Sequence, residues 1–334
     1  LDPNDPIEVS YAKPFEGEPL GSTHPELLTV YKHSHGHDQA VVNGISRIGY
    51  MKGGKSALWK DEEIADRITE KAVEFIQTNK SNPFFLYLGT NDIHVPRVPH
   101  PRFAGKSGMG PRGDAILEFD WTVSEIMQTL KDNKLLEKTI GIISSDNGPV
   151  IDDGYQDQAV ELLGDHKAGG VYRGGKYSAF EAGTRVPCIV SYPGKITKGV
   201  TDALVSQVDL IASFAALLGV ELPEKAAPDS FDQREAWAGK DKTGRDYAVE
   251  QSLTKTLSLI SGKWKYIEPS NGQVHNKNTN TELGNNTQPQ LYDLSADQGE
   301  TVNLAEQNPG QVEAFNVALG NLKKSEFTRN HPIW

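Results

Sequence analysis

Apolar and polar residues alternate along the chain in two kinds of pattern, which together predict a mixed α/β protein. Residues 61–79 (DEEIADRITEKAVEFIQTN) repeat apolar side chains at helical spacing, with acidic residues in the first turn. Residues 114–131 carry a second apolar face of the same kind. Continuous apolar runs at 84–88 and 139–145 are typical of strands buried on both faces. This alternation of helix and strand predicts a sheet whose strands are largely parallel.

The alternation continues downstream. Residues 184–194 (TRVPCIVSYPG) predict a third strand. Residues 206–219 (SQVDLIASFAALLG) predict a short helix that ends at Gly219, because glycine readily adopts the left-handed conformation that closes a helix. The first 60 residues have many Pro, Gly and His residues and few periodic signals, so we expect a long segment that wraps over the surface.

The pattern changes after about residue 240. Short alternating segments separated by turn residues predict strands, a polar stretch at 271–290 predicts a loop, and residues 309–326 predict a final helix. We therefore expect an α/β domain over residues 1–240, and a smaller α+β subdomain with an antiparallel sheet and a terminal helix over residues 241–334.

Composition and charge narrow the class of protein. The chain has 334 residues, 37% of them hydrophobic, and a mean hydropathy of −0.50, values typical of a soluble globular protein. No window approaches the roughly 18 apolar residues of a membrane span. The net charge of −11 and the lack of a dense Lys/Arg tract argue against nucleic acid as a partner. Cys188 is the single cysteine, and its apolar neighbours predict a buried core thiol.

Polar side chains follow one of the predicted strands directly. Asp146 and Asn147 come after the strand at 139–145, and ligands gather beyond the carboxyl ends of strands in open α/β sheets. Carboxylate and amide oxygens are ligands of Ca2+ and Mg2+. Asp-Asn-Gly is also a strong turn signal without any metal, so the tripeptide alone leaves both interpretations open.

Two further loops supply an imidazole and a cation. His94 and His100 lie in the segment 91–100 (NDIHVPRVPH), where prolines stiffen the backbone, and an imidazole there can donate to an anion or act as a general acid. Lys176 lies in Arg-Gly-Gly-Lys, where two glycines let the backbone approach a ligand and the ammonium supplies a point charge. Each group is also compatible with an ordinary exposed loop.

Histidine and aspartate gather in two other stretches. His35 and His37 lie in HSHGHD, and Asp152 and His166 lie in the acidic segment after Asp-Asn-Gly. A transition-metal tract is one interpretation of the histidine-rich stretch. Hydrogen bonding to a sugar and a plainly solvated loop are the others, and residue types alone do not separate them.

Taken together, these pieces resemble the sulfatase family of the alkaline-phosphatase-like superfamily. Five segments match in the family's order over roughly residues 40 to 310: PFFLYLGTNDIHVPRVPHPRF, IGIISSDNG, YRGGKYSAFEAGTRVPCIVSYPG, LVSQVDLIASFAALLGV and QLYDLSADQGETVNLA. The resemblance implies an alkaline-phosphatase-like α/β/α sandwich followed by the smaller C-terminal α+β subdomain.

The resemblance also implies roles for particular residues. Asp146 and Asn147 resemble two ligands of a divalent cation, usually Ca2+ (or Mg2+). His94 and Lys176 resemble the catalytic groups that contact the sulfate ester. The candidates for contact with the rest of the substrate are His35, His37, His100, Asp152, His166 and Arg173.

The nucleophile of the resembled family is a formylglycine, made from Cys or Ser in a Cys/Ser-x-Pro/Ala-x-Arg motif. This motif is absent from the sequence, since Cys188 is followed by Ile-Val. The two early acidic metal ligands and the Gly-Lys-Trp-His segment of the family are absent as well. We therefore expect the chain to be the C-terminal two-thirds of a sulfatase, with the formylglycine in a missing N-terminal part of the same protein and little or no turnover by the chain alone.

The expected function is hydrolysis of a sulfate ester. A sulfated sugar is favoured over an aryl sulfate, because the loops are long, polar and rich in His and Asp. The family implies a periplasmic, secreted or lysosomal location. Two other classes remain open: a phosphodiesterase or phosphonate hydrolase of the same superfamily, and a non-catalytic glycan-binding relative.

Overall fold

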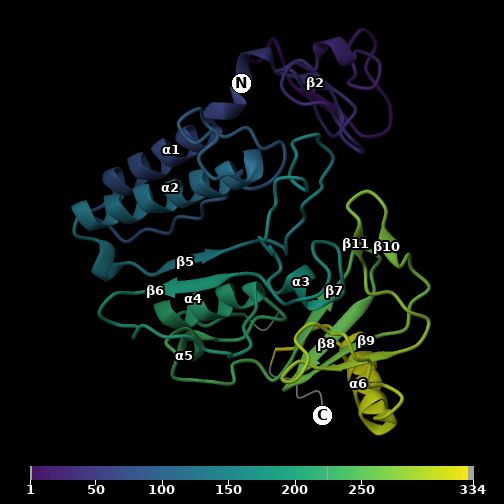
Figure 1. Cartoon of the computed structure of the whole chain (residues 1–334). Coiled ribbons are helices and arrows are strands. Elements are labelled where there is room, and N and C mark those ends of the chain that lie inside the picture. The colour runs from purple at the N-terminus through teal and green to yellow at the C-terminus, as the bar shows by residue number, and fades with distance from the viewer. Residues whose placement is uncertain (1, 224, 330–334) are drawn as a thin grey trace. The chain divides into compact units, whose positions relative to one another are not determined.

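The computed structural model describes residues 2–223 and 225–329, and the chain divides into two compact units (Figure 1). Each unit is built from two separate stretches of chain: the first from residues 1–136 and 151–166, and the second from residues 137–150 and 167–334. The domain boundary expected at residue 240 falls inside the second unit.

Two helices form the body of the first unit. Helices α1 (Ile64–Asn79) and α2 (Gly110–Asp132) lie side by side (Figure 1), and the Thr69 hydroxyl donates a hydrogen bond to the Thr122 hydroxyl at 3.1 Å between them. Ile76 is among the buried apolar residues of α1. Both helices predicted from apolar spacing are therefore confirmed, with α2 starting four residues earlier than expected.

The first 60 residues contain only short elements. Their strands form two-stranded antiparallel ribbons, β1 with β4 and β2 with β3. The bounds are β1 (Glu8–Ser10), η1 (Pro25–Leu27), β2 (Val41–Val42), β3 (Ile45–Ser46), β4 (Tyr50–Lys52) and η2 (Lys55–Ala57), with η3 (Asp61–Glu63) leading into α1. The expected loop-rich segment is present.

The apolar run at 84–88 is not a strand, contrary to the prediction. Phe85 and Tyr87 are 69% and 82% exposed, and no described residue pairs with this run in a sheet. An extended segment becomes a strand only when a neighbouring segment satisfies its backbone N–H and C=O groups. Phe84 instead packs edge-on against Phe75 of α1, with ring centroids 5.7 Å apart.

The second unit contains the other two predicted strands, but in an unexpected arrangement. β5 (Gly141–Ser144) pairs with β6 (Cys188–Ser191) in an antiparallel two-stranded ribbon. All pairings between the named strands of the described residues are antiparallel, and the only parallel pairings there are two isolated bridges, so the expected largely parallel sheet is not found. Cys188 is exposed rather than buried, because a two-stranded ribbon leaves one of its faces open.

The predicted C-terminal antiparallel sheet and terminal helix are confirmed. The four strands lie in the order β12-β9-β8-β7, and α6 (Pro309–Leu322) packs on the sheet (Figure 1). Tyr266 of β9 and Phe315 of α6 are each 1% exposed and belong to one apolar core. The strand bounds are β7 (Ala248–Gln251), β8 (Leu257–Ser261), β9 (Trp264–Ile267) and β12 (Gln290–Asp293).

Short elements complete the second unit, including a third sheet of two strands, β10 and β11. Helix α4 (Leu210–Leu218) ends at Gly219, whose φ of 67° is left-handed as predicted. The others are η4 (Leu136–Lys138), α3 (Glu181–Thr184), η5 (Gln207–Asp209), α5 (Arg234–Trp237), β10 (His275–Asn276) and β11 (Thr281–Glu282). Among the described helices, none has the length and apolarity needed to cross a bilayer.

Candidate active site

The Asp-Asn-Gly segment forms a turn just after β5, with the carboxylate exposed and the amide half-buried. The Asn147 side-chain nitrogen donates to the Gly148 carbonyl oxygen at 2.9 Å. No hydrogen bond within the described part of the chain uses Asn147 Oδ1, so that oxygen is available to a cation. The described residues contain no group of three His, Cys, Asp or Glu side chains able to hold a metal. Asp146 and Asn147 would therefore supply only part of a coordination shell.

The turn is fastened to α3 through Gly148. The Gly148 N–H donates to the Gly183 carbonyl oxygen at 2.9 Å. A Cβ at position 148 would lie 1.6 Å from the Ala182 carbonyl oxygen, so only glycine allows this close approach. The glycine that marked a turn in the sequence is therefore needed for packing as well.

The lysine loop is fastened to the same turn. The Lys176 N–H donates to the Pro149 carbonyl oxygen at 2.8 Å, and a Cβ at Gly175 would lie 2.7 Å from that oxygen. Tyr177 follows with a φ of 85°, a left-handed conformation that is strained for an aromatic residue. The Lys176 ammonium lies 5.4 Å from the centroid of the Tyr177 ring. The structure thus brings two of the predicted site segments together.

A buried charge network lies behind these loops. Lys265 of β9 is fully buried, and its ammonium lies 2.8 Å from Glu181, 3.3 Å from Glu250 and 3.7 Å from Glu300. Burial lowers the pKa of Lys265, but the three carboxylates outweigh it and raise that pKa above its usual value. Burial raises the pKa of Glu300 to about 7, although Lys265 opposes the change. The network thus places one buried ammonium among three carboxyl groups, and Arg185, whose side chain is 41% exposed, adds a second cation 3.1 Å from Glu181.

The network reaches the site through the backbone of α3. The Glu300 carboxylate accepts a hydrogen bond from the Glu181 N–H at 2.7 Å, at the start of α3. The Ala182 N–H donates to the Arg173 carbonyl oxygen at 2.9 Å, and the Gly183 carbonyl holds Gly148. The C-terminal sheet therefore positions both the Asp-Asn-Gly turn and the lysine loop.

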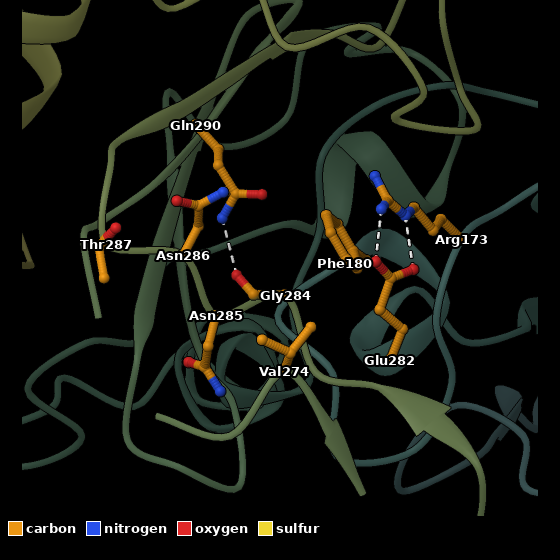
Figure 2. A pocket seen from close by; sticks show the side chains of 9 residues that line it. All are labelled: Arg173, Phe180, Val274, Glu282, Gly284, Asn285, Asn286, Thr287 and Gln290. Carbon is orange, nitrogen blue, oxygen red and sulfur yellow. Dashed lines mark hydrogen bonds and ion pairs between the residues drawn. The ribbon is translucent and has the colours of Figure 1, made fainter. Parts of the chain in front are cut away.

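Arg173, a predicted substrate-binding residue, lines a pocket of about 320 Å³ (Figure 2). Its Nε donates to Glu282 at 2.8 Å in a two-pronged ion pair, and its Nη1 donates to the Glu300 carbonyl oxygen at 2.6 Å. The guanidinium carbon lies 4.1 Å from the centroid of the Phe180 ring. Contact of Arg173 with substrate stays a prediction, because all three of its guanidinium nitrogens donate hydrogen bonds within the protein.

His94 lies in the first unit, on a loop held by a buried arginine. Arg97 is 3% exposed and donates to Asp157 at 2.8 Å, to the Ile93 carbonyl at 3.2 Å and to the Ile151 carbonyl at 3.3 Å. These bonds tie the histidine loop to the segment that begins at Ile151. His94 Nδ1 lies 2.8 Å from the Val95 carbonyl oxygen, so this nitrogen is the donor of that hydrogen bond.

Two of the predicted sugar-contacting histidines lie near His94. His94 Nε2 is 3.9 Å from the carboxylate of Asp153, which also acts on His37. Burial lowers the pKa of His37, while the hydrogen bond to the His35 carbonyl oxygen and the charge of Asp153 oppose the change. The His37 ring packs on Tyr155, with centroids 4.7 Å apart. His35, His37 and His94 therefore surround the segment next to Asp152 in the first unit.

The other predicted contacts of the first unit lie apart from this group. His100 Nε2 is 3.6 Å from Asp66 of α1, and its backbone N–H donates to Glu118 of α2 at 3.1 Å. His166 is exposed and makes a backbone hydrogen bond to the Leu163 carbonyl oxygen at 3.3 Å. The role of His100 and of His166 in substrate binding stays a prediction.

The sequence did not reveal the residues that hold the site in place. Lys265 sits in an ordinary alternating strand, and its carboxylate partners lie 15 to 84 residues away in the chain. Asp153 was one of several acidic residues in a loop that looked solvated. The one available signal in the sequence was the place of Lys265 between Trp264 and Tyr266 in a predicted strand. The structure shows this lysine to be buried, and lysine is almost never fully buried unless it is paired.

Comparison with known proteins identifies the class. The sulfatase family model matches residues 21–220, and the chain belongs to the sulfatase family. The resemblance seen in the sequence motifs is thereby confirmed.

Two curated sulfatases are similar to this chain in sequence. N-acetylgalactosamine-6-O-sulfatase of Bacteroides thetaiotaomicron is 57% identical over 323 residues, which cover 97% of this chain and 63% of the relative. Human arylsulfatase A is 33% identical over 239 residues, covering 67% of this chain and 45% of that protein. The chain thus spans less than two thirds of the length of either relative.

Solved structures agree with these relatives. A structure from work on the metabolism of multiple glycosaminoglycans by Bacteroides thetaiotaomicron matches with a TM-score of 0.95 and 56% identity, over 97% of this chain and 68% of that one. The PsFucS1 sulfatase from Pseudoalteromonas sp. matches with a TM-score of 0.66 and 26% identity, over 81% of this chain and 55% of that one. The mixed α/β fold is that of solved sulfatases.

Proposed function

We propose that the protein is a sulfuric ester hydrolase that removes sulfate from a sulfated carbohydrate, with 6-sulfated N-acetylgalactosamine as the substrate unit. The observation that carries the proposal is the fastening of the Asp146–Asn147 turn and the Lys176 loop to each other through Gly148 and Pro149. A hard-cation turn beside an ammonium suits a tetrahedral anion. The 57% identity to an N-acetylgalactosamine-6-O-sulfatase supports the choice of sugar.

Asp146 and Asn147 would hold a divalent cation, Ca2+ or Mg2+. Their side chains fit this role because both offer hard oxygens, and the Asn147 amide nitrogen is already engaged with the Gly148 carbonyl. When bound, such a cation neutralises charge on the sulfuryl oxygens.

Lys176 and His94 would act on the ester itself. The Lys176 ammonium would pair with a sulfuryl oxygen and stabilise the charge that develops there as the S–O bond breaks. His94 would hold Nδ1–H toward Val95 and present Nε2 to a sulfuryl oxygen or to the leaving oxygen. The carboxylate of Asp153 lies 3.9 Å from that nitrogen.

The nucleophile would be a formylglycine of the kind that the family uses. Residues 1–334 contain no Cys or Ser in the corresponding motif, so within the protein that group would lie outside this sequence. A periplasmic, secreted or lysosomal location, as in the family, remains part of the proposal.

The test is sulfate release by the full-length protein from 6-sulfated N-acetylgalactosamine, measured by ion chromatography. Lys176→Ala and His94→Ala should each lower kcat/KM at least about a hundredfold, as expected for groups that stabilise transition-state charge or transfer a proton. His24→Ala, a change at an exposed histidine that is not among the predicted site residues, is the matched control and should have a much smaller effect. If the wild-type protein binds the sugar and releases no sulfate, a non-catalytic glycan-binding function replaces this proposal.

A further inference from the structure

The pocket beside Arg173 is lined by hydroxyl-recognising groups rather than by free charges. Figure 2 shows the amides of Asn285, Asn286 and Gln290 on one side, and the Arg173–Glu282 pair on the other. The pair joins one guanidinium to one carboxylate through two hydrogen bonds, so the charges in the wall cancel. An anionic ligand would therefore find no unpaired cation among the residues that line this pocket.

The rear of the pocket is rigid. Asn285 is 5% exposed, and its amide bonds to the Thr254 and Thr256 hydroxyls and to the Gln273 carbonyl oxygen. Gln290 is 4% exposed, donates to the Gly284 carbonyl at 2.7 Å and accepts from Tyr292. Walls fixed in this way cost little ordering when a ligand binds.

The rim offers the groups that remain for a ligand. Asn286 and Thr287 are exposed, and no hydrogen bond within the described residues uses Asn286 Nδ2 or Thr287 Oγ1. Val274, 56% exposed, adds apolar surface beside them. An amide and a hydroxyl can donate to and accept from sugar hydroxyls, and the apolar C–H face of a ring suits the valine.

The pocket adjoins the lysine loop. Arg173 lies three residues before Lys176, and a Cβ at Gly175 would lie 3.6 Å from the Thr281 methyl group, next to Glu282 of β11. The polar stretch 271–290, which the fold alone does not explain, thus contributes most of a pocket wall beside a predicted sulfate-binding group.

We propose that this pocket binds an uncharged sugar ring of the glycan, next to the sulfated unit. The inference rests on the proposed sulfatase function for the position of the sulfated sugar, but the pocket and its chemistry are independent of turnover. A ring that carries a carboxylate would find no unpaired cation in the lining and is disfavoured, whereas a neutral hexose or N-acetylhexosamine matches the amide and hydroxyl lining.

The direct test is calorimetric titration of the full-length protein with an unsulfated, uncharged disaccharide of galactose and N-acetylgalactosamine. Val274→Trp fills the pocket from an exposed position and should weaken binding at least about tenfold. Asn278→Trp adds the same bulk to the same loop outside the pocket and should leave Kd unchanged. Asn286→Ala with Thr287→Val should weaken binding by about three- to tenfold.

Kinetics separate this inference from the proposed function. Kinetics would be measured with a sulfated disaccharide and a sulfated monosaccharide as substrates. Val274→Trp should raise the KM for the disaccharide about tenfold relative to the KM for the monosaccharide. If the protein releases no sulfate while Val274→Trp still blocks the neutral disaccharide, the proposed function fails and the sugar pocket stands. If Val274→Trp and Asn278→Trp bind the disaccharide alike, or if a uronate-containing disaccharide binds as well as the neutral one, the inference is overturned.

Discussion

One buried charge cluster in each unit holds unequal numbers of cations and carboxyl groups, and the surplus has opposite sign in the two clusters. In the first, Arg97 and Arg112 share one carboxylate, Asp157, which Arg97 binds at 2.8 Å. Arg112 is 2% exposed, and its Nε and Nη1 have no hydrogen-bond partner in the described part of the chain. Burial, then the charge of Arg97, lowers the pKa of Arg112 to about 10. In the second unit a single ammonium faces three carboxyl groups.

The difference shows which charges hold the candidate site. Arg97 and Lys265 are the paired cations, and each fastens a predicted catalytic loop to its surroundings. Arg112 and Glu300 carry the surplus charge of their clusters. The pKa of Arg112 is lowered and that of Glu300 is raised, so both changes favour the neutral form of the side chain. Removing a paired cation should therefore cost far more than removing a surplus charge.

The largest effect is expected for Lys265→Met. Glu250 and Glu300 would lose the cation between them, and Glu181 would keep only its ion pair with Arg185 at 3.1 Å. The free energy of unfolding should therefore fall by about 3–5 kcal/mol in urea titrations. Lys263→Met is the control, because Lys263 is 52% exposed and its pair with Asp293 contributes at most about 1 kcal/mol. Equal losses for the two variants would contradict the comparison.

A smaller, pH-dependent effect is expected for Glu300→Gln. The pKa of Glu300 is about 7 in the folded protein, against about 4.3 for an unperturbed glutamate, so the proton on this carboxyl stabilises the fold. That contribution is complete below about pH 4.3 and is lost as the pH rises through about 7. The glutamine variant should therefore exceed wild type by about 2 kcal/mol at pH 8 and match it near pH 4, measured by denaturant unfolding. A gap that does not change with pH would show that Glu300 does not titrate in this range.

The smallest effect is expected for Arg112→Met. The change removes a buried guanidinium whose Nε and Nη1 make no hydrogen bond in the described part of the chain, and Asp157 keeps its ion pair with Arg97. Stability should therefore stay the same or rise by at most about 1 kcal/mol in thermal unfolding. Arg97→Met is the contrast, with an expected loss of about 3 kcal/mol because Asp157 would be left unpaired. A large loss for Arg112→Met would show that its charge interaction with Asp157 outweighs the cost of burying the guanidinium.

Local patterns in the sequence were enough to predict the elements. Apolar spacing predicted α1 and α2, and alternation with turn residues predicted β7, β8 and β9. The turn at Asp146 and the loop of Lys176 were found because each adjoins a predicted strand. These signals act over a few residues and need no knowledge of the partner segments.

Errors arose where the outcome depends on distant segments. The predictions of a buried strand at 84–88 and of a buried Cys188 thiol used only the apolar residues next to them in the sequence. Exposure, however, is decided by which distant segments pack against them. The antiparallel pairing of β5 with β6 is likewise a property of two segments about 45 residues apart. The partners of Lys265 could not be found for the same reason.

The β5–β6 ribbon also provides a spectroscopic handle. Its register sets Cys188 directly opposite Ser144, two residues before Asp146, and the thiol is exposed. As the one cysteine of this sequence, it can take a fluorophore or a spin label without any engineered mutation. If the neighbouring turn binds the proposed cation, a probe on that sulfur would report its occupancy as a change in emission or line shape.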